Sequence, residues 1–142
     1  MSPDDGRSPD TAGPRATQPV PVLPAYAGAS LAGVVPALMA PPGRRPDWLP
    51  PVAAAAGQVI LLVVDGLGWG QLVTRAGLAP NITGLTGGAM TSVVPTTTAT
   101  ALTSIAFGTP PAAHGMVGYR LKVTGRNGND EVLNALHWTT HS

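Results

Sequence analysis

The sequence has no cysteine and a single lysine, Lys122, among its 142 residues. Without cysteine there can be no disulfide bond, thiolate metal site or cysteine nucleophile. The absence of cysteine also leaves the redox state of the protein's compartment undetermined. Charge is also scarce, because the formal net charge is +1 and no basic run is longer than the pair Arg44-Arg45. This charge balance gives no electrostatic reason to expect nucleic acid or an anionic membrane as a partner.

Long hydrophobic runs are missing as well. Residues 25–40 are fairly apolar, but Pro36 interrupts them. No stretch reaches the roughly 18 to 20 uninterrupted apolar residues of a membrane-spanning helix. A secretory signal peptide would begin nearer the start of the chain, behind a basic leader. The default expectation is therefore a cytoplasmic protein.

The composition divides the chain into three parts. Residues 1–24 are rich in Pro, Asp, Ser, Thr and Gly, which predicts a disordered leader because so few apolar side chains cannot offset the entropy lost on ordering. Residues 25–57 predict a short helix, capped by Ser30 and ending at Met39, and then a Pro-rich linker. Residues 58–142 predict an α/β domain.

Strand and helix patterns alternate within this last part. The expected elements are strands at 58–64 and 90–94, helices at 69–76 and 97–107, a helical turn at 80–85, and a hairpin of 119–124 with 131–138. Residues 59–64 of the first strand are apolar throughout, as is typical of a strand covered on both faces in a parallel sheet. The order strand, helix, strand, helix predicts a mostly parallel sheet with flanking helices.

Asp65 stands where the first predicted strand ends, and it is the only acidic residue between Asp47 and Asp130. Such a carboxylate must be paired, bound to a metal or exposed to water, because an isolated buried charge is costly. An Asp after a strand also often caps the next helix or fixes a turn. Taken alone, Asp65 leaves that structural alternative open.

A threonine cluster, Thr96-Thr97-Thr98, follows the second predicted strand. One of these residues could simply cap the next helix. In a parallel sheet, however, Asp65 and Thr98 both lie at the carboxyl ends of strands, where open α/β sheets bind ligands. A helix N-terminus there favours phosphate, and a carboxylate could hold a divalent metal that activates the hydroxyl. Together these features predict phosphoryl transfer through a threonine.

Other motifs are incomplete. Gly66-Leu67-Gly68 starts a dinucleotide-binding pattern, but Gln71 stands where the third glycine belongs. There is also no Gly-Lys-Ser/Thr of a phosphate-binding loop. His114 lies in a loop rich in Gly and Pro, where a hydrogen bond that braces the loop is favoured over a role as a ligand.

Four motifs recur in an order and spacing that resemble a known family. They are Val63-Val64-Asp65-Gly66, Ala79-Pro80-Asn81, Val94-Pro95-Thr96-Thr97-Thr98 and Gly108-Thr109-Pro110-Pro111-Ala112-Ala113-His114-Gly115. From Val59 to Tyr119 the chain is similar to the type I phosphodiesterase/nucleotide pyrophosphatase branch of the alkaline phosphatase superfamily, and its flanking strings resemble actinobacterial members. The resemblance implies a metal-dependent hydrolase of small phosphoesters or phosphodiesters, and it leaves the oligomeric state open.

The resemblance also implies roles for three residues. Asp65 matches a metal-binding aspartate, and Thr98 matches the nucleophile, which binds the same metal and is transiently phosphorylated or nucleotidylated. Tyr119 stands where nucleotide pyrophosphatases place a phosphate-binding Asn, so it is a candidate for substrate binding. Tyr119 thus replaces the Asn, and residues 99–101 replace the usual Phe-Pro-Asn. Both departures from the family pattern argue against nucleotide specificity.

The family's centre holds two zinc ions, and most of their Asp and His ligands lie in a longer downstream half. Asp130, His137 and His141 do not match that pattern. One carboxylate and one threonine oxygen are short of the four ligands of a stable zinc site. We therefore expect the N-terminal portion of an alkaline-phosphatase-like domain, inactive by itself. The alternatives are a non-catalytic fragment and a small nucleotide-binding α/β module.

Overall fold

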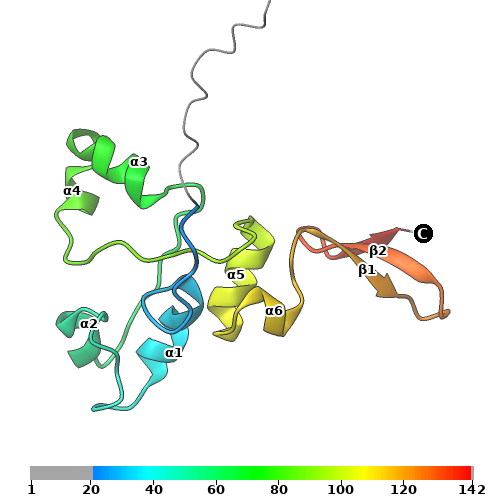
Figure 1. Cartoon of the computed structure of the whole chain (residues 1–142), viewed down its shortest axis with the longest axis horizontal. Helices are drawn as coiled ribbons and strands as arrows, with labels where there is room; N and C mark the ends of the chain where they lie inside the picture. The colour runs from blue at the N-terminus through cyan, green and yellow to red at the C-terminus, as the bar shows by residue number, and fades with distance from the viewer. Residues whose placement is uncertain (1–20, 142) are drawn as a thin grey trace, which may run out of the picture.

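The computed structural model describes residues 21–141. The predicted disordered leader, 1–24, lies outside the described residues except for its last four positions. The elements are η1 (Leu31–Gly33), α1 (Val34–Met39), α2 (Pro51–Ala55), α3 (Trp69–Thr74), η2 (Ala76–Leu78), α4 (Pro80–Thr83), α5 (Thr98–Phe107), α6 (Pro111–His114), β1 (Arg120–Thr124), β2 (Asp130–Asn134) and β3 (Thr139–His141). In Figure 1, α5 and α6 lie between the strands on one side and α3 and α4 on the other.

The best-packed part of the chain is the helix α5 against η1, α1 and α6 (Figure 1). The side chains buried there are mostly small; they are Ala32, Ala37, Ala99, Thr100 and Ser104, beside the larger Ile105. Small side chains let the helices approach closely, and α5 ends at Gly108 in a left-handed conformation with a φ of 66°. This helix cluster supports the segment that precedes α5 and so positions the start of α5.

The predicted parallel sheet is not found among residues 21–141. Segment 59–64 is extended but pairs with no strand, and Ile60 and Leu62 are 90% and 80% exposed. The second predicted strand, 90–94, makes one isolated parallel bridge, between Ser30 and Thr91. A parallel strand needs neighbours on its edges, and the described residues supply none for 59–64. The fold is therefore a mixture of helices and a small antiparallel sheet.

The predicted hairpin is confirmed. Strands β1 and β2 pair antiparallel, with Lys122 opposite Val132. The chain reverses between them with Gly128 at a φ of 80°, a conformation that glycine adopts without strain. The third strand, β3, pairs with β2 and was not expected.

The predicted helices are confirmed as η1 with α1, as α3, as α4 and as α5. The short helices α2 and α6 lie in segments that were expected to be linker and loop. Each begins with a proline, whose fixed φ suits the first helical position. No helix in the described part of the chain is long and apolar enough to cross a membrane.

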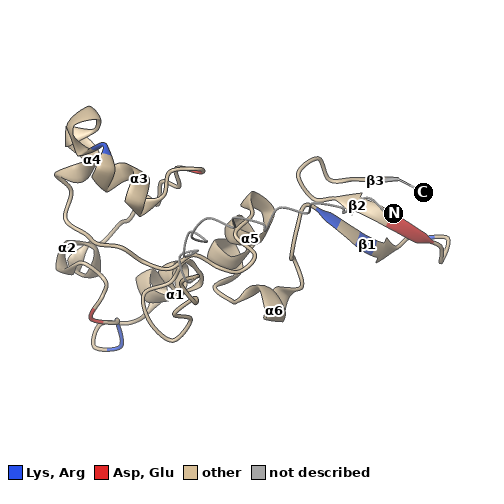
Figure 2. Ribbon diagram, turned by 45° about the horizontal axis from the view of Figure 1, so that its top comes forward, with Lys and Arg blue, Asp and Glu red and all other residues tan. Residues whose placement is uncertain are grey.

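The charged side chains lie outside the α-helices. None of α1 to α6 contains Lys, Arg, Asp or Glu, as Figure 2 shows. Within the described residues these side chains lie in loops and in the hairpin, where the Lys122 Nζ and the Asp130 Oδ2 are 2.6 Å apart. The surroundings of α5 are therefore almost free of formal charge.

Candidate functional site

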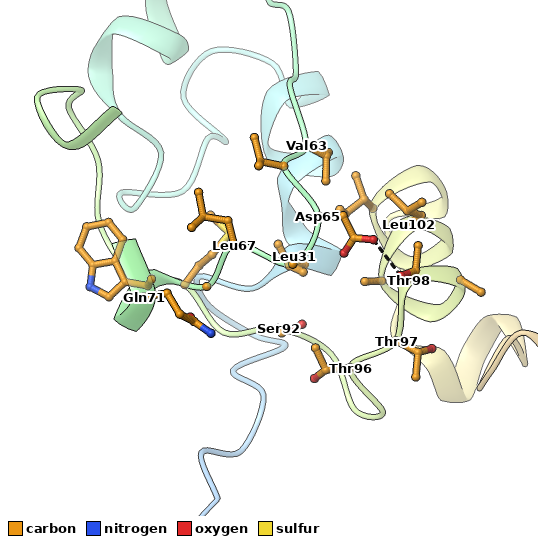
Figure 3. A pocket seen from close by; sticks show the side chains of 18 of the residues that line it. Leu31, Val63, Asp65, Leu67, Gln71, Ser92, Thr96, Thr97, Thr98 and Leu102 are labelled. Carbon is orange, nitrogen blue, oxygen red and sulfur yellow. Dashed lines mark hydrogen bonds between the residues drawn. The ribbon is translucent and has the colours of Figure 1, made fainter. Parts of the chain in front are cut away.

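A cleft of about 640 Å³ opens where segment 59–64 ends and α5 begins. Leu67 and Gln71 lie on one side of it in Figure 3, across from Leu102. The chain turns sharply at Gly66, whose φ is 76°, and this turn leads from the extended segment toward α3. The cleft thus collects side chains from parts of the chain that are far apart in the sequence.

Asp65 and Thr98 meet in this cleft. The Thr98 hydroxyl donates a hydrogen bond to Oδ2 of Asp65, with 2.8 Å between the two oxygens, although the residues are 33 positions apart (Figure 3). Thr98 is half-buried, whereas Asp65 is exposed at the cleft. The exposed Asp65 carboxylate is therefore paired with the threonine hydroxyl, and no side-chain bond of a helix cap is found at α3.

The three clustered threonines use their hydroxyls differently. Thr96 donates to the carbonyl oxygen of Val93 at 2.6 Å. Thr97, the N-cap of α5, shares a hydrogen bond of 2.8 Å with the hydroxyl of Thr100, which is fully buried. The Thr98 hydroxyl is the one of the three that reaches a carboxylate. Thr98 is also the first residue of α5, where backbone N–H groups and the positive end of the helix dipole favour an anion.

Tyr119 lines the same cleft, and its side chain is half-exposed. The guanidinium carbon of Arg120 lies 5.6 Å from the centre of the Tyr119 ring, a cation–π distance. All three residues singled out from the sequence, Asp65, Thr98 and Tyr119, are thus brought to one cleft.

Sequence reasoning missed the opposite wall of the cleft, which includes Leu67, Trp69 and Gln71. The signal that could have found them is their position in the glycine-rich turn directly after Asp65. Such a turn folds the following side chains back toward the end of the strand segment.

A zinc ion needs more ligands than this pair provides. Asp65 and Thr98 supply two oxygen donors, whereas stable zinc sites have four ligands. Within residues 21–141 no group of three or more His, Cys, Asp or Glu side chains is arranged to hold a metal ion. Asp130, which does not match the family's ligand pattern, is paired with Lys122 in the hairpin. The described residues alone do not fit a complete zinc site.

Comparison with protein families places the chain in a known family. The family model described as Type I phosphodiesterase / nucleotide pyrophosphatase matches residues 59–140, which is more than half of the chain and includes Asp65, Thr98 and Tyr119. Comparisons with curated proteins and with solved structures give no match.

Proposed function

Because the chain belongs to the type I phosphodiesterase/nucleotide pyrophosphatase family, which acts on small phosphoesters, we propose that it contributes the nucleophile of a phosphoester or phosphodiester hydrolase. Thr98 is that nucleophile, and Asp65 holds its hydroxyl in place. The observation that supports this assignment is the 2.8 Å hydrogen bond between the two side chains at the start of α5.

The reaction proposed is a displacement at phosphorus. The oxygen of Thr98 forms a bond to phosphorus while the bond to the leaving oxygen breaks, and the hydroxyl proton moves along the hydrogen bond toward Asp65. The backbone N–H groups and the dipole at the start of α5 stabilise the negative charge on the phosphoryl oxygens. Water then cleaves the phosphothreonine and frees the Thr98 hydroxyl.

Metal dependence is part of the proposal, with zinc as the ion and Asp65 and Thr98 as two of its ligands. A bound metal would supply Lewis-acid stabilisation of the phosphoryl group. The rest of the ligand set is not among the described side chains. Tyr119, from its place in the cleft, contacts the substrate.

A second candidate function is favoured by this short set of ligands. A non-catalytic module that binds phosphoesters or nucleotides needs the cleft and the N-terminus of α5, but it does not need a complete metal centre. It predicts saturable binding without turnover.

The test is hydrolysis of bis(4-nitrophenyl) phosphate by the whole chain, with and without added Zn²⁺. We expect little release of nitrophenol, because the described residues do not complete a zinc site, and Thr98→Ala should reduce it to the buffer blank while Thr98→Ser partly retains it. Thr103→Ala is the matched control, because Thr103 lies on the same helix but does not line the cleft. Mass spectrometry of a quenched reaction should find one 4-nitrophenylphosphoryl group on Thr98, because only one of the two nitrophenol groups leaves in the first displacement.

Unchanged turnover in Thr98→Ala would overturn the proposed role of this residue. Binding of the diester without any release of nitrophenol, with or without Zn²⁺, would instead support the non-catalytic module.

A further inference from the structure

The imidazole of His114 joins three segments of the chain. His114 is the last residue of α6, and its Nε2 lies 2.8 Å from Oγ of Ser104 in α5. Its Nδ1 lies 3.0 Å from the backbone nitrogen of Met116, in the linker of residues 115–118 that leads toward β1. Because a backbone N–H can only donate, Nδ1 is the acceptor and carries no proton. The arrangement therefore requires the neutral ring, with its proton on Nε2.

The bond to Nδ1 is the main tie between the linker and the helices. Among the described residues, no backbone hydrogen bond is found for Val117 or Gly118, and Val117 is 52% exposed. The strands beyond the linker pack mainly on one another, and Figure 1 shows the linker as the connection from α6 to β1. The position of the hairpin relative to α5 and α6 therefore depends on how firmly the linker is held.

Protonation of the ring breaks one of these bonds and keeps the other. Imidazolium carries a proton on both nitrogens, so its Nδ1–H would face the N–H of Met116, and two donors cannot bond to each other. The Nε2–H still donates to the Ser104 hydroxyl. The linker is thus held while the ring is neutral, and it is released as the pH falls through the range in which histidine side chains change charge, about pH 8 to 5.

The surroundings of His114 offer the imidazolium no new partner. The segments that it contacts, which are α5, the rest of α6 and the linker, contain no Lys, Arg, Asp or Glu. Arg120 is the nearest charged residue along the chain, and its guanidinium carbon lies 5.6 Å from the centre of the Tyr119 ring. Within residues 21–141 no carboxylate forms an ion pair with His114. Protonation therefore removes the bond to Met116 without replacing it.

The hairpin carries two side chains of the cleft wall. Tyr119 precedes β1 and Leu136 follows β2, and both line the cleft that contains Asp65 and Thr98. A hairpin that moves relative to α5 takes both side chains away from this wall. Release of the linker therefore opens the cleft on the side of the hairpin.

We propose that His114 is a pH-sensitive switch: the neutral ring fixes the linker and keeps the hairpin at the cleft, and protonation of Nδ1 frees the hairpin. The switch needs only the two hydrogen bonds of His114 and the course of the linker. It is therefore independent of the proposed reaction at Thr98.

Two substitutions separate the two bonds of the ring. His114→Asn keeps an acceptor near the position of Nδ1 that does not gain a proton in this pH range. Asn127 and Asn134 already accept the same kind of bond, from the backbone N–H two residues later, at 3.0 and 3.1 Å. His114→Gln instead places its amide near Ser104 and lacks an acceptor at the position of Nδ1. We expect His114→Asn to hold the linker at every pH, and His114→Gln to release it at every pH.

The experiment measures the distance between α6 and the hairpin in the whole chain, by pulsed electron paramagnetic resonance at about pH 8 and about pH 5. Because the chain has no cysteine, spin labels attach only at Ala112→Cys in α6 and Arg126→Cys in the hairpin turn, both at exposed positions. We expect a narrow distance distribution at the higher pH and its loss at the lower pH. The narrow distribution should persist at both pH values in His114→Asn and be absent at both in His114→Gln.

Hydrogen exchange of the Met116 amide tests the same switch without any substitution. Its protection, relative to an unstructured peptide at the same pH, should fall by about two- to tenfold from the higher to the lower pH, as expected for the loss of one hydrogen bond. His137→Asn is the control, because His137 is exposed and its side chain forms no hydrogen bond within the described residues, and it should keep both responses.

Three results would overturn the inference: the same distance distribution at both pH values in the chain with His114, a pH response that survives in His114→Asn, or protection of the Met116 amide that does not change with pH. Far-UV circular dichroism at both pH values verifies that α5 stays folded. Hydrolysis assays of Thr98→Ala bear on the proposed reaction alone, so either proposal can fail while the other stands.

Discussion

The Oγ of Ser104 lies 2.8 Å from Nε2 of His114, and this hydrogen bond joins α5 to α6. The other ring nitrogen, Nδ1, accepts a hydrogen bond from the backbone N–H of Met116 at 3.0 Å. In the neutral ring the proton therefore sits on Nε2 and is donated to Ser104. His114 braces its loop, as the sequence favoured, and it does not line the cleft.

We expect His114→Ala to lower the free energy of unfolding by about 1 to 3 kcal/mol, because the hydroxyl of the fully buried Ser104 would lose its partner. A double-mutant cycle with Ser104→Ala should give a coupling energy of about 0.5 to 1.5 kcal/mol in urea unfolding. His137→Ala is the control, because His137 is exposed in the hairpin region. A coupling energy near zero would show that the contact does not stabilise the fold.

We expect Ser30→Ala to have the opposite effect on the free energy of unfolding. The side chain of Ser30 is fully buried, and its hydroxyl has no hydrogen-bond partner among the described residues. Ser30→Ala removes an unpaired polar group and should raise the free energy of unfolding by about 1 kcal/mol. Ser104→Ala, at an equally buried serine whose hydroxyl is paired, should lower it. Thermal and urea unfolding of the two variants should shift in opposite directions, and a loss of stability in Ser30→Ala would contradict this.

Local signals account for the parts of the fold that the sequence predicted well. The hairpin depends on Asn127-Gly128, and α5 depends on its own apolar pattern and on Gly108 as its end. Such elements are set by residues close together in the chain. The pairing of segment 59–64 is different, because it depends on neighbouring strands that its own residues do not specify. For that reason the apolar pattern predicted a strand and a parallel sheet, and neither is found for this segment within residues 21–141.

The candidate site was also predicted only in part from the sequence. Asp65 and Thr98 were expected to be neighbours because both would lie at carboxyl ends of parallel strands. They are neighbours without that sheet, since the turn at Gly66 and the start of α5 bring them together. Their catalytic and metal-binding roles stay predictions. Trp69 was not predicted to line the cleft, because its place depends on how the turn after Asp65 folds.

The close approach of α5 to α1 depends on Gly108. A Cβ atom at this position would lie 2.5 Å from Cγ of Pro36, and the φ of 66° is unfavourable for any residue with a Cβ. We expect Gly108→Ala to lower the free energy of unfolding by about 2 to 4 kcal/mol, from the left-handed backbone and the overlap together. Pro36→Ala in the same chain should recover the part that comes from the overlap.

Gly87→Ala is the matched control for this change. A Cβ at Gly87 would have no atom within 4 Å, so urea unfolding should change by no more than about 0.5 kcal/mol. Equal effects at Gly87 and Gly108 would mean that the loss of glycine itself, and not the contact with Pro36, determines the stability.

Segment 59–64 should make the chain self-associate. Its six residues are apolar, contain no charge or proline, and take part in no backbone hydrogen bond within the described residues. An extended segment of this kind can pair with a copy of itself. Ile60→Lys places a charge at a side chain that is 90% exposed, and it should lower the light scattering of a concentrated solution without lowering stability. Met39→Lys adds the same charge to α1, at a side chain that is 79% exposed, and should leave the scattering unchanged. If the two variants reduced scattering equally, net charge rather than the unpaired segment would control the association.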